Sequence, residues 1–408
     1  MAFSRGPKIV TDGLVFGYDT GYPVVSGSSD TYRFNLGEPT TNVLNDTIQG
    51  GGSGTSLGSD SFGEFIQLGD NTSGYSYFRL PSITLSSNET YTWSFELYTT
   101  ETFNRETNNY SFDQNEYSDQ HTGNDASRAS FSQSQPNSIP AGQWTPFKLT
   151  VTMKDSLTGA YTQDLFRFYY PAFQNKKVYY RNMQFERDKD HKTPYAGQGG
   201  SRSNTGALID LTGNKTIDLS NVSFNSDAQM KFNGTDNRID TALYHISGSD
   251  HTEEVVVYRN ATGTTHGILS DLQYGFYGFY IDSANKVKYR QMQQVSDGQG
   301  GFTYPAAAAT STTTLGTGFY HLVGSFSSAN GFRVYINGEL DGTNGTDLPF
   351  NPSGNRGINH IGVYKDSNAT TYNHPFDGRI DIVKCYNREL TQEEVANNFN
   401  AIKNRFNL

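Results

Sequence analysis

The sequence has one cysteine, no long apolar run and no export signal, and each absence excludes a class of protein. Cys385 has no second cysteine for an intrachain disulfide, so we expect it to be a small buried side chain. No apolar run reaches the length of a membrane span, and the N-terminus, MAFSRGPKIV (1–10), lacks the apolar region of a signal peptide. The sequence therefore predicts synthesis in a cytoplasm and no membrane partner.

Positive charge is scarce as well. The formal net charge is −10, only 18% of the residues are charged, and no basic cluster is longer than Lys176-Lys177. Because binding to nucleic acid requires a basic face that neutralises phosphates, we expect no nucleic-acid partner.

Glycine and aromatic residues are abundant instead. The chain contains 42 glycines, and aromatic residues make up 14% of its 408 positions. Short strands joined by tight turns have this composition, so it predicts an all-β fold. The length exceeds that of one ordinary domain and fits two sandwiches of about 150 to 200 residues each.

Two stretches in the C-terminal third show the clearest local patterns. In GFYHLVGSFSSANGFRVYINGEL (318–340), apolar alternation on both sides of a polar turn predicts a β-hairpin that ends at a tight Asn-Gly turn. In FDGRIDIVKCYNRELTQEEVANNF (376–399), residues 380–383 predict a buried strand. Thr391 followed by Glu394 forms a capping box, which predicts a short helix after that strand.

Together with FNGTDNRIDT (232–241) and IGVY (361–364), these stretches resemble the signature of the laminin-G-like, concanavalin A-like jelly rolls. Near the N-terminus, DGLVFGYDTG (12–21) resembles the segment that opens such domains in phage proteins, and LIDLTGNKTIDL (208–219) resembles the piece that follows it. The resemblance implies a laminin-G-like sandwich made of its first strand, within residues 1–22, and of residues 204–408.

The residues between these two parts are predicted to form a second sandwich, inserted into the first. Period-two alternation in four segments predicts half-buried strands. These segments are 75–85, 89–100, 143–153 and 165–173. VYYRNMQFERDKDHKTPYAGQGGSRS (178–203) is similar to the closing strand of galactose-binding-like and carbohydrate-binding-module jelly rolls of phage proteins. Residues 23–203 are therefore assigned to an inserted jelly roll of that kind with a polar lead-in.

The whole prediction is two antiparallel jelly-roll β-sandwiches with one short C-terminal helix. The alternative arrangement is a separate N-terminal arm followed by two domains in tandem. The Gly/Ser-rich segment 48–65 is predicted as a loop or an irregular edge, and the long polar 104–138 and the Pro/Ala/Thr-rich 301–314 are predicted as loops. The second of these is also the first place to look for a partner surface.

Signals for catalysis are weak. Glucanases of the concanavalin A-like fold carry a Glu-x-Asp-x-x-Glu strand, and this sequence has none. Glu253-Glu254 is predicted to lie on a solvated face, and Glu393-Glu394 opens the helix, where carboxylates favour the dipole. The eight histidines show no zinc-binding spacing. We therefore expect no enzymatic activity.

Two sets of binding residues are the candidates. Asp236, Asp240 and Asp377 match positions near loops that approach calcium in some laminin-G-like domains, although aspartates in such turns often bond their own backbone instead. Tyr364, Tyr372 and His374 form the best candidate rim for a glycan, because sugar rings stack on exposed aromatics.

Tryptophans offer a further prediction. Trp93 and Trp144 both lie in alternating strands, so both are expected in the core rather than on a glycan platform.

The resemblance implies a non-enzymatic virion structural protein of a tailed bacteriophage, either a fibre or tail adhesin or a head decoration protein. Its partners would be other virion proteins, host or environmental polysaccharide, and further copies of the chain, and calcium is the one candidate cofactor. Such a protein is made in the host bacterial cytoplasm and ends in the virion. The alternatives are a secreted or cell-surface glycan-active enzyme or its accessory binding module, and a structural protein without any ligand.

Overall fold

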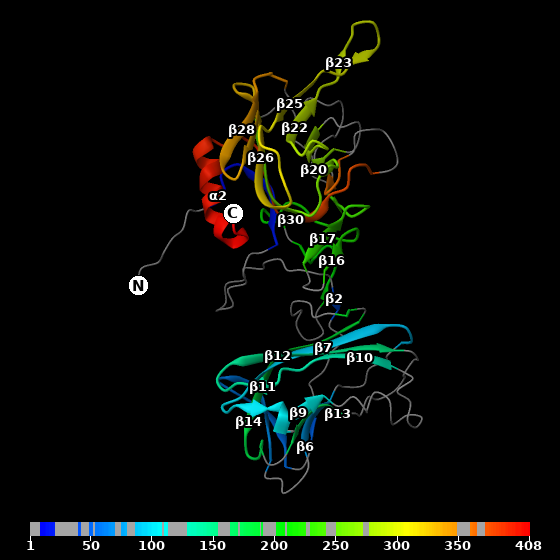
Figure 1. Cartoon of the computed structure of the whole chain (residues 1–408), viewed down its shortest axis with the longest axis vertical. Helices are drawn as coiled ribbons and strands as arrows, with labels where there is room; N and C mark the ends of the chain where they lie inside the picture. Colours follow the sequence, from blue (N-terminus) through cyan, green and yellow to red (C-terminus); the bar gives the residue numbers. More distant parts are fainter. Residues whose placement is uncertain are drawn as a thin grey trace. The chain divides into compact units, whose positions relative to one another are not determined.

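The computed structural model (Figure 1) describes most of the chain in eighteen segments. These are residues 9–20, 40–41, 49–51, 54–69, 75–79, 86–107, 110–112, 129–153, 164–169, 172–187, 189–190, 201–208, 210–225, 229–241, 250–271, 277–348, 360–364 and 372–408. Apart from one 3-10 turn and one C-terminal α-helix, the regular structure of these segments is β-strand, and the strands pair into antiparallel sheets. The prediction of all-β sandwiches with a C-terminal helix is confirmed.

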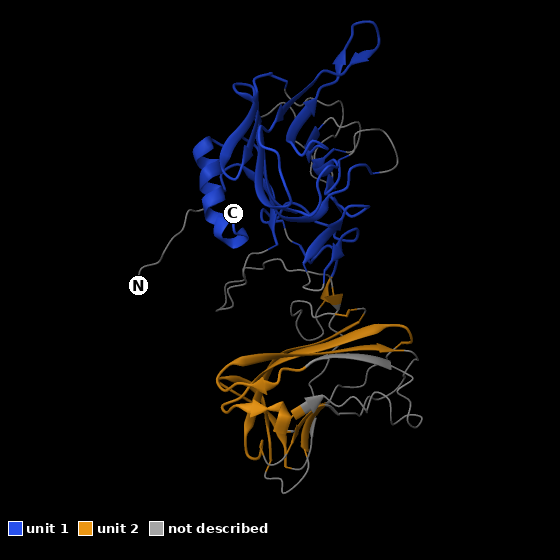
Figure 2. Ribbon diagram, viewed as in Figure 1, with its two compact units in different colours: residues 1–38, 203–225, 229–408 blue, residues 39–202, 226–228 orange. Residues whose placement is uncertain are grey.

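The chain divides into two compact units (Figure 2). Unit 1 contains Met1–Glu38, Ser203–Asn225 and Gln229–Leu408, and unit 2 contains Pro39–Arg202 and Ser226–Ala228. The kinship of the second unit with carbohydrate-binding modules stays a prediction. Among the described residues, no helix is long and apolar enough to cross a membrane.

Unit 2 consists of two sheets around an aromatic core. One has the order β10-β12-β7-β14-β5-β4 and the other β3-β6-β13-β9, with the small pairs β11-β8 and β15-β2 beside them. The elements are β2 (Thr40–Thr41), β3 (Gln49–Gly51), β4 (Ser56–Asp60), β5 (Gly63–Gln67), β6 (Tyr75–Arg79), β7 (Thr90–Tyr98), β8 (Phe103–Asn104), η1 (Arg105–Thr107), β9 (Tyr110–Phe112), β10 (Ala129–Ser134), β11 (Ser138–Ile139), β12 (Trp144–Met153), β13 (Asp164–Tyr169), β14 (Lys177–Arg187) and β15 (Ser201–Arg202).

The core of unit 2 is held by ring contacts within and between its two sheets. Phe95 of β7 lies 5.2 Å from Phe147 of β12 and 5.4 Å from Phe166 of β13, measured between ring centroids. Trp93 packs 4.5 Å from Phe95 and is fully buried, as the sequence predicts. Aromatic pairs at these distances add to the free energy gained from burying their area.

Two segments of unit 2 with loop-like composition contain strands. In 48–65 the strands β3 and β4 are sheet edges, as one of the two predicted alternatives has it, whereas the loop prediction for 104–138 is wrong. Residues 48–65 hold β3, β4 and the start of β5, because Ile66 anchors this hairpin in the core although its composition is rich in glycine and serine. Residues 104–138 hold β9, β10 and the start of β11, with Tyr110 buried against Phe147. In both cases partners distant in sequence supply the burial that the local composition hides.

Unit 1 is a sandwich of an eight-stranded and a six-stranded sheet. The first has the order β16-β17-β30-β19-β26-β27-β28 with β1 on β30, and the second has the order β18-β29-β20-β21-β22-β25. The elements are β1 (Leu14–Asp19), β16 (Ser223–Phe224), β17 (Met230–Asn233), β18 (Ile239–Asp240), β19 (His251–Arg259), β20 (His266–Ser270), β21 (Tyr277–Ile281), β22 (Val287–Met292), β23 (Val295–Ser296), β24 (Phe302–Thr303), β25 (Ala306–Thr310), β26 (Gly318–Ser327), β27 (Gly331–Ile336), β28 (Glu339–Asn344), β29 (His360–Ile361), β30 (Asp377–Tyr386) and α2 (Gln392–Phe406).

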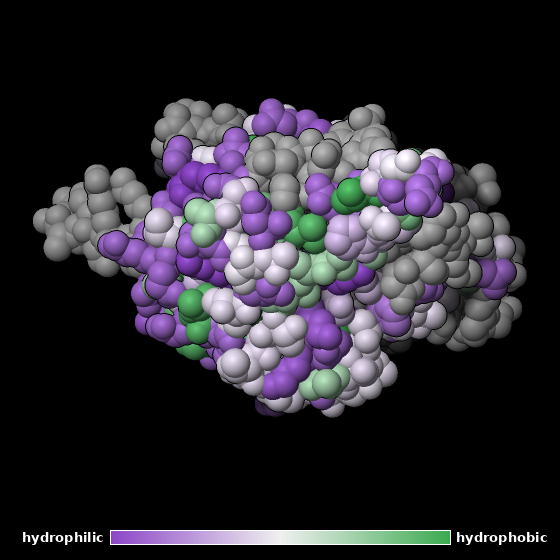
Figure 3. Space-filling model, turned by 90° about the horizontal axis from the view of Figure 1, so that it is seen from above, coloured by the Kyte–Doolittle hydropathy of each residue, from purple (hydrophilic) through white to green (hydrophobic). Residues whose placement is uncertain are grey.

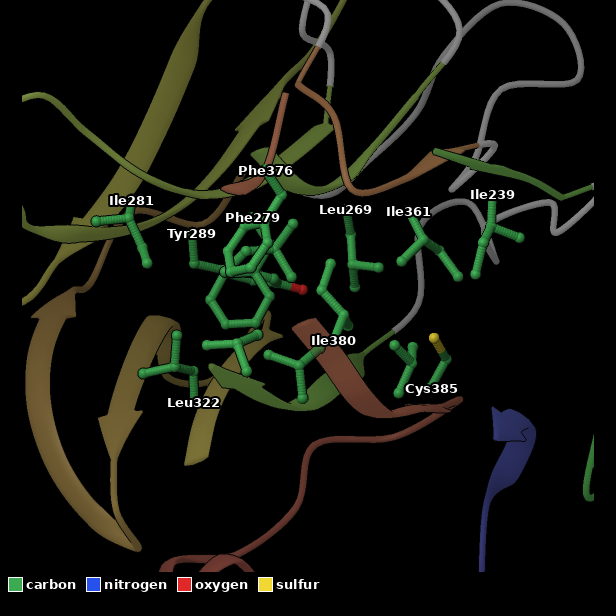
Figure 4. Close-up of a cluster of buried hydrophobic side chains, with 14 of the residues drawn as sticks. Ile239, Leu269, Phe279, Ile281, Tyr289, Leu322, Ile361, Phe376, Ile380 and Cys385 are labelled. Atoms are coloured by element: carbon green, nitrogen blue, oxygen red, sulfur yellow. The ribbon is translucent and has the colours of Figure 1, made fainter. Parts of the chain in front are cut away.

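Apolar side chains of both sheets meet inside unit 1. Figure 4 shows Phe279 and Tyr289 of the six-stranded sheet directed toward Leu322 and Ile380 of the eight-stranded one. Cys385 lies in the same core and is a buried free cysteine, as predicted from the sequence. The predicted loop 301–314 is corrected as well, because Ala306–Thr310 pairs with β22 as an edge strand.

The N-terminal segment is built into the eight-stranded sheet. β1 pairs antiparallel with β30, with Phe16 opposite Cys385 and Tyr18 opposite Val383. On its other side, the amide of Gly17 donates to Asp210 Oδ1 at 3.0 Å, and the amide of Leu211 donates to the carbonyl of Gly17 at 2.7 Å. Residues near positions 17 and 210 thus lie side by side next to a strand of the C-terminal third.

Helix α2 covers the outer face of the eight-stranded sheet. Its capping box is formed as predicted: Glu394 N–H donates to Thr391 Oγ1, and Thr391 N–H donates to the Glu394 carboxylate. Val395 and Ile402 pack against apolar residues of the sheet, including Tyr335 and Val256. The sheet is therefore buried on both faces.

Burial on both faces overturns the prediction of a solvated Glu253-Glu254 pair. Glu253 faces the interior of the sandwich and accepts a hydrogen bond from Tyr289, whereas Glu254 lies beneath α2 with its side chain fully buried. Lys384 Nζ lies 2.8 Å from Glu254 Oε1, and Asn398 of α2 donates to Glu254 Oε2 at 2.6 Å. Neighbours far along the chain compensate both carboxylates, which the local pattern could not reveal.

Candidate functional site

The outer face of the six-stranded sheet of unit 1 carries an aromatic cluster. Strand alternation directs Phe279 and Tyr289 inward, and it directs Tyr280 and Arg290 to the opposite face. Tyr364, which follows β29, lies over this face. Tyr280, Arg290, Tyr364 and His374 are called the outer-face cluster below.

Two glycines allow Tyr364 to lie close to the sheet. A Cβ added at Gly267 of β20 would be 1.9 Å from the Tyr364 amide nitrogen, and one added at Gly278 of β21 would be 2.5 Å from the Tyr364 ring. No other residue type fits at such approaches, so both glycines are required by the position of this ring. Tyr364 is 6% exposed and forms the floor of the cluster.

Three rings are layered in this cluster. Tyr280 and Tyr364 stack at 4.3 Å with 12° between their planes, and Tyr364 and His374 stack at 5.9 Å with 22°. Arg290 Nη1 donates to the Tyr364 hydroxyl at 3.3 Å. Tyr280, His374 and Arg290 are each partly exposed, so the cluster lies at the surface of unit 1.

A second group lies on β18, β29 and the segment after them. His360 Nδ1 and Arg238 Nε both approach Asp240 Oδ1 at 2.9 Å. The Arg238 guanidinium lies 3.8 Å from the centre of the Tyr372 ring, whose edge contacts His360. Burial alone raises the pKa of Asp240, but the bonds from His360 and Arg238 outweigh it, so the pKa of this carboxyl is lowered.

The structure therefore separates the three residues predicted as a glycan rim. Tyr364 and His374 come together in one stack, whereas Tyr372 packs against Arg238 and His360. Sequence reasoning missed Tyr280 and Arg290, although period-two alternation in 277–292 places both on the same face.

The three aspartates predicted for calcium also differ in their surroundings. Asp236 accepts from Asn233 Nδ2 at 2.7 Å, and Asp377, which lies opposite Asn233 in the sheet, accepts from Asn260 Nδ2 at 3.0 Å. Asp240 is bound to His360 and Arg238 instead. Within the described segments, no group of three or more His, Cys, Asp or Glu residues is arranged to hold a metal ion. Calcium binding stays a prediction.

Unit 2 exposes a second aromatic surface, and it corrects the prediction that Trp144 is a core residue. Trp144 is half-buried at the start of β12, and its ring lies parallel to that of Phe62 within 3° at 5.9 Å. Phe62 is 48% exposed. Period-two alternation predicts that one face of β12 is buried but does not say which, and Trp144 points away from the core.

Comparison with known proteins finds a similarity within unit 1. Residues 233–396 match the family model described as the concanavalin A-like lectin/glucanases superfamily. This region contains the outer-face cluster and is similar to the lectin-like domains of that superfamily. No curated protein matches the chain.

Solved structures with detectable similarity include several binding proteins. The botulinum neurotoxin serotype D ligand binding domain in complex with N-acetylneuraminic acid is 12% identical, with a TM-score of 0.33, over 48% of this chain and 49% of that chain. The Ruminococcus gnavus IT-sialidase CBM40 bound to α2,3 sialyllactose is 14% identical, with a TM-score of 0.29, over 37% and 82%. Trypanosoma rangeli sialidase is 17% identical, with a TM-score of 0.34, over 52% and 35%. The chain thus spans about half of the botulinum protein.

Proposed function

We propose that this protein is a non-enzymatic structural protein of a tailed-bacteriophage virion, a fibre or tail adhesin or a head decoration protein, whose lectin-like sandwich binds surface polysaccharide. It also contacts neighbouring virion proteins and further copies of itself. The resemblance of residues 12–21 and 208–219 to phage proteins supports the virion part of this proposal. The lectin-like domain supports the binding part.

The outer-face cluster is the observation that carries the binding function. A sugar ring has a face of C–H groups and an edge of hydroxyls, so a pocket for it combines a flat aromatic surface with hydrogen-bonding groups. Tyr280 and His374 flank Tyr364 as parallel rings, and Arg290 supplies N–H donors beside them. A guanidinium carries five N–H donors in a fixed plane, which suits it to bind ligand oxygens beside the ring stack.

The arrangement of carboxylates favours binding over hydrolysis. Glycoside hydrolysis requires two carboxyl groups that face the same bound sugar. In the adjacent pair Glu253 and Glu254, the side chains point to opposite faces of β19 and are both buried. Asp240, on the outer face, is held by His360 and Arg238 with a lowered pKa, which does not suit a general acid.

Binding to soluble polysaccharides, followed by isothermal titration calorimetry, tests this function. Tyr280→Ala removes one ring of the stack, and His374→Asn removes another while keeping a residue that tolerates the φ of 51° at this position. Each is expected to weaken binding by about tenfold, the loss of roughly one aromatic contact. Phe302→Ala, an exposed ring on β24 of the same unit, is the matched control. Equal affinity of all variants would remove the outer-face cluster as the binding site.

The proposed location of the protein in the virion is tested separately. Mass spectrometry of purified virus particles, followed by placement in a cryo-EM map, is expected to find the chain in the virion. Its absence from the particles would contradict the virion role, and release of reducing ends from algal or capsular polysaccharide would contradict the non-enzymatic one. Binding that disappears in EDTA and returns with calcium would establish the predicted cofactor.

A further inference from the structure

Unit 2 carries a continuous row of aromatic rings on the outer face of its six-stranded sheet. Trp144 of β12 lies opposite Tyr98 of β7, Tyr98 lies opposite Tyr179 of β14, and Tyr179 lies opposite Phe65 of β5. Phe62, from the turn between β4 and β5, packs onto this row at 4.6 Å from Tyr98 and 4.7 Å from Tyr179. These five residues are called the aromatic ladder. With a strand spacing of about 4.8 Å, the row extends roughly 14 Å across four strands.

The ladder is not needed to fill the core. The core residues of these strands, such as Leu97, Val178 and Ile66, point to the other face and are fully buried. Other large exposed apolar residues of the described segments include Leu211 and Leu340, which belong to unit 1. On the face of the molecule in Figure 3, hydrophobic residues likewise form small areas among hydrophilic ones. Scattered apolar residues are normal on a surface, whereas a contiguous aromatic patch marks an interaction site.

The turn that carries Phe62 contradicts ordinary turn chemistry. β4 ends at Asp60 and β5 begins at Gly63, so Ser61 and Phe62 form the tip of a two-residue hairpin loop. Such tips favour Gly, Asn or Asp, and a phenylalanine there has no local advantage. The Asp60 carboxylate accepts from the Phe62 amide at 2.9 Å and fixes this turn. A residue that violates a local preference and yet is held in place indicates a functional position.

Charged groups are interleaved with the rings. The Arg181 guanidinium lies 4.1 Å from the Trp144 ring centre, and its Nε donates to Glu96 at 2.6 Å. Lys177 lies 4.2 Å from the centre of the Phe65 ring and 3.3 Å from Asp60 Oδ2. The cationic side chains of Arg181 and Lys177 are 47% and 42% exposed. Each cation is matched by a carboxylate, so the ladder is electrically balanced.

The combination of aromatic rings and paired charges favours one class of ligand over others. An apolar protein surface docked here would remove water from two ion pairs without replacing its hydrogen bonds, which is costly. A sugar chain offers C–H faces to the rings and hydroxyls to the same charged groups, so it replaces that water. An acidic polysaccharide would gain nothing from a patch whose charges already cancel.

We propose that the aromatic ladder is a second glycan-binding site, which takes an uncharged polysaccharide chain across strands β12, β7, β14 and β5. This second site rests on the proposed function only because both sites take a glycan as their ligand. The row spans several rings, so the site fits consecutive sugar units of an extended chain rather than one terminal sugar.

The two tryptophans make the test direct. Trp93 is fully buried and Trp144 is partly exposed, so a ligand on the ladder changes the fluorescence of Trp144. The full-length protein is titrated with laminarin and hydroxyethyl cellulose, which are uncharged, and with alginate, which is acidic. We expect a saturable change with at least one uncharged polymer and none with alginate. Binding of alginate alone, or of no polymer, overturns the proposal.

Substitutions then test whether the polysaccharide binds at the aromatic ladder. Phe62→Ala is expected to weaken binding by about tenfold without changing the thermal unfolding of unit 2, because Phe62 lies outside the core. Trp144→Phe keeps a ring and is expected to retain affinity in calorimetry while losing the fluorescence signal. Tyr75→Ala, a partly exposed ring on the other sheet, is the control. Unchanged affinity of Phe62→Ala overturns the proposal.

Variants of the outer-face cluster of unit 1 distinguish a failure of this proposal from a failure of the proposed function. If Tyr280→Ala weakens binding and Phe62→Ala has no effect, the proposed function stands and the ladder is not a site. If only Phe62→Ala weakens binding, the ladder is the site and the outer-face cluster is not.

Discussion

The two sandwiches stabilise their interiors by different means. Unit 2 fills the space between its sheets with rings such as Trp93, Phe95 and Phe147. Unit 1 buries charge as well: Glu254 is 0% and Lys384 is 3% exposed beneath α2. Rings tolerate many exchanges of similar volume, whereas a buried ion pair tolerates the loss of neither partner. The comparison teaches that unit 1 adds a buried ion pair to its apolar core, whereas aromatic rings dominate the core of unit 2.

The aromatic surfaces of the two units differ in how far their rings are exposed to solvent. The central ring of the unit 1 cluster, Tyr364, is 6% exposed, and the ring that crowns the unit 2 ladder, Phe62, is 48% exposed. Aromatic residues thus form a nearly closed floor in one unit and an open row in the other. Both tryptophans lie in unit 2, so tryptophan fluorescence reports on unit 2 and leaves unit 1 to other probes.

Loss of the buried carboxylate should break unit 1 with the largest effect. Glu254→Ala leaves Lys384 buried without its partner, and we expect the free energy of unfolding of unit 1 to fall by about 3–5 kcal/mol. Hydrogen-exchange mass spectrometry of β26 and β30 measures this loss, while the tryptophan transition of unit 2 stays in place. Glu393→Ala, exposed in the first turn of α2, is the control and should have little effect. A shift of the tryptophan transition would show that the two interiors are not independent.

Truncation in the aromatic core should give the reciprocal result. Leu149 is fully buried in β12 opposite Trp93, and Leu149→Ala is expected to cost unit 2 about 3 kcal/mol. Urea denaturation followed by tryptophan fluorescence detects it, and hydrogen exchange in β26 should not change. Leu149→Met, which conserves volume, should cost less than about 1.5 kcal/mol. Equal losses for both variants would mean that packing volume does not control the stability of unit 2.

Removal of Asp210 should sharpen the comparison, because it tests a second buried polar group of unit 1. Its carboxylate accepts from the amides of Gly17, Thr212, Asn214 and Lys215. Asp210→Ala leaves these donors without their acceptor and is expected to cost about 2 kcal/mol.

Faster hydrogen exchange in residues 14–19 is the readout for this variant. Asp218→Ala removes a carboxylate that accepts from the amide of Ser220 in a more exposed turn, and it serves as the matched control. Unchanged exchange in 14–19 would show that β1 is held by β30 without help from Asp210.

The smallest effect is expected at the start of α2. The Arg388 guanidinium, which pairs with Glu394, lowers the pKa of this carboxyl to about 2 from 4.5. Because the folded pKa is the lower one, the stabilisation is complete above pH 4.5 and is lost as the pH falls toward 2. Glu394→Gln should therefore cost about 1 kcal/mol near pH 7 and almost nothing at pH 2. Unfolding of unit 1 measured at several pH values tests this, and a cost that does not vary with pH would contradict it.

Local signals in the sequence predicted the elements that local physics controls. The hairpin of β26 and β27 follows from alternation, and the tight turn from β27 to β28 follows from Asn337 and Gly338, which have positive φ angles of 49° and 85°. The capping box of α2 follows from Thr391 and Glu394 alone. In these cases the residues that determine the structure are neighbours in the chain.

Elements that depend on distant partners escaped prediction. Glu254 is tolerated in the interior because Lys384 lies 130 positions away in sequence but 2.8 Å away in space. The strand Ala306–Thr310 forms from residues of low strand propensity because β22 offers a free edge. For the candidate sites, Tyr364 and His374 were predicted together, whereas the exposure of Trp144 depends on which face of β12 the second sheet covers.

The pairing of β1 with β30 has a consequence for biosynthesis. The Tyr18 hydroxyl donates to the carbonyl of Ile380, which the ribosome adds 362 residues later. At roughly 5–20 residues per second, the first strand waits on the order of half a minute for its neighbour, while the intervening unit emerges complete. Unit 2 can therefore mature during translation, whereas unit 1 closes only after release of its last strand. A chaperone that shields Leu14–Asp19 during this interval would raise the yield of assembled protein.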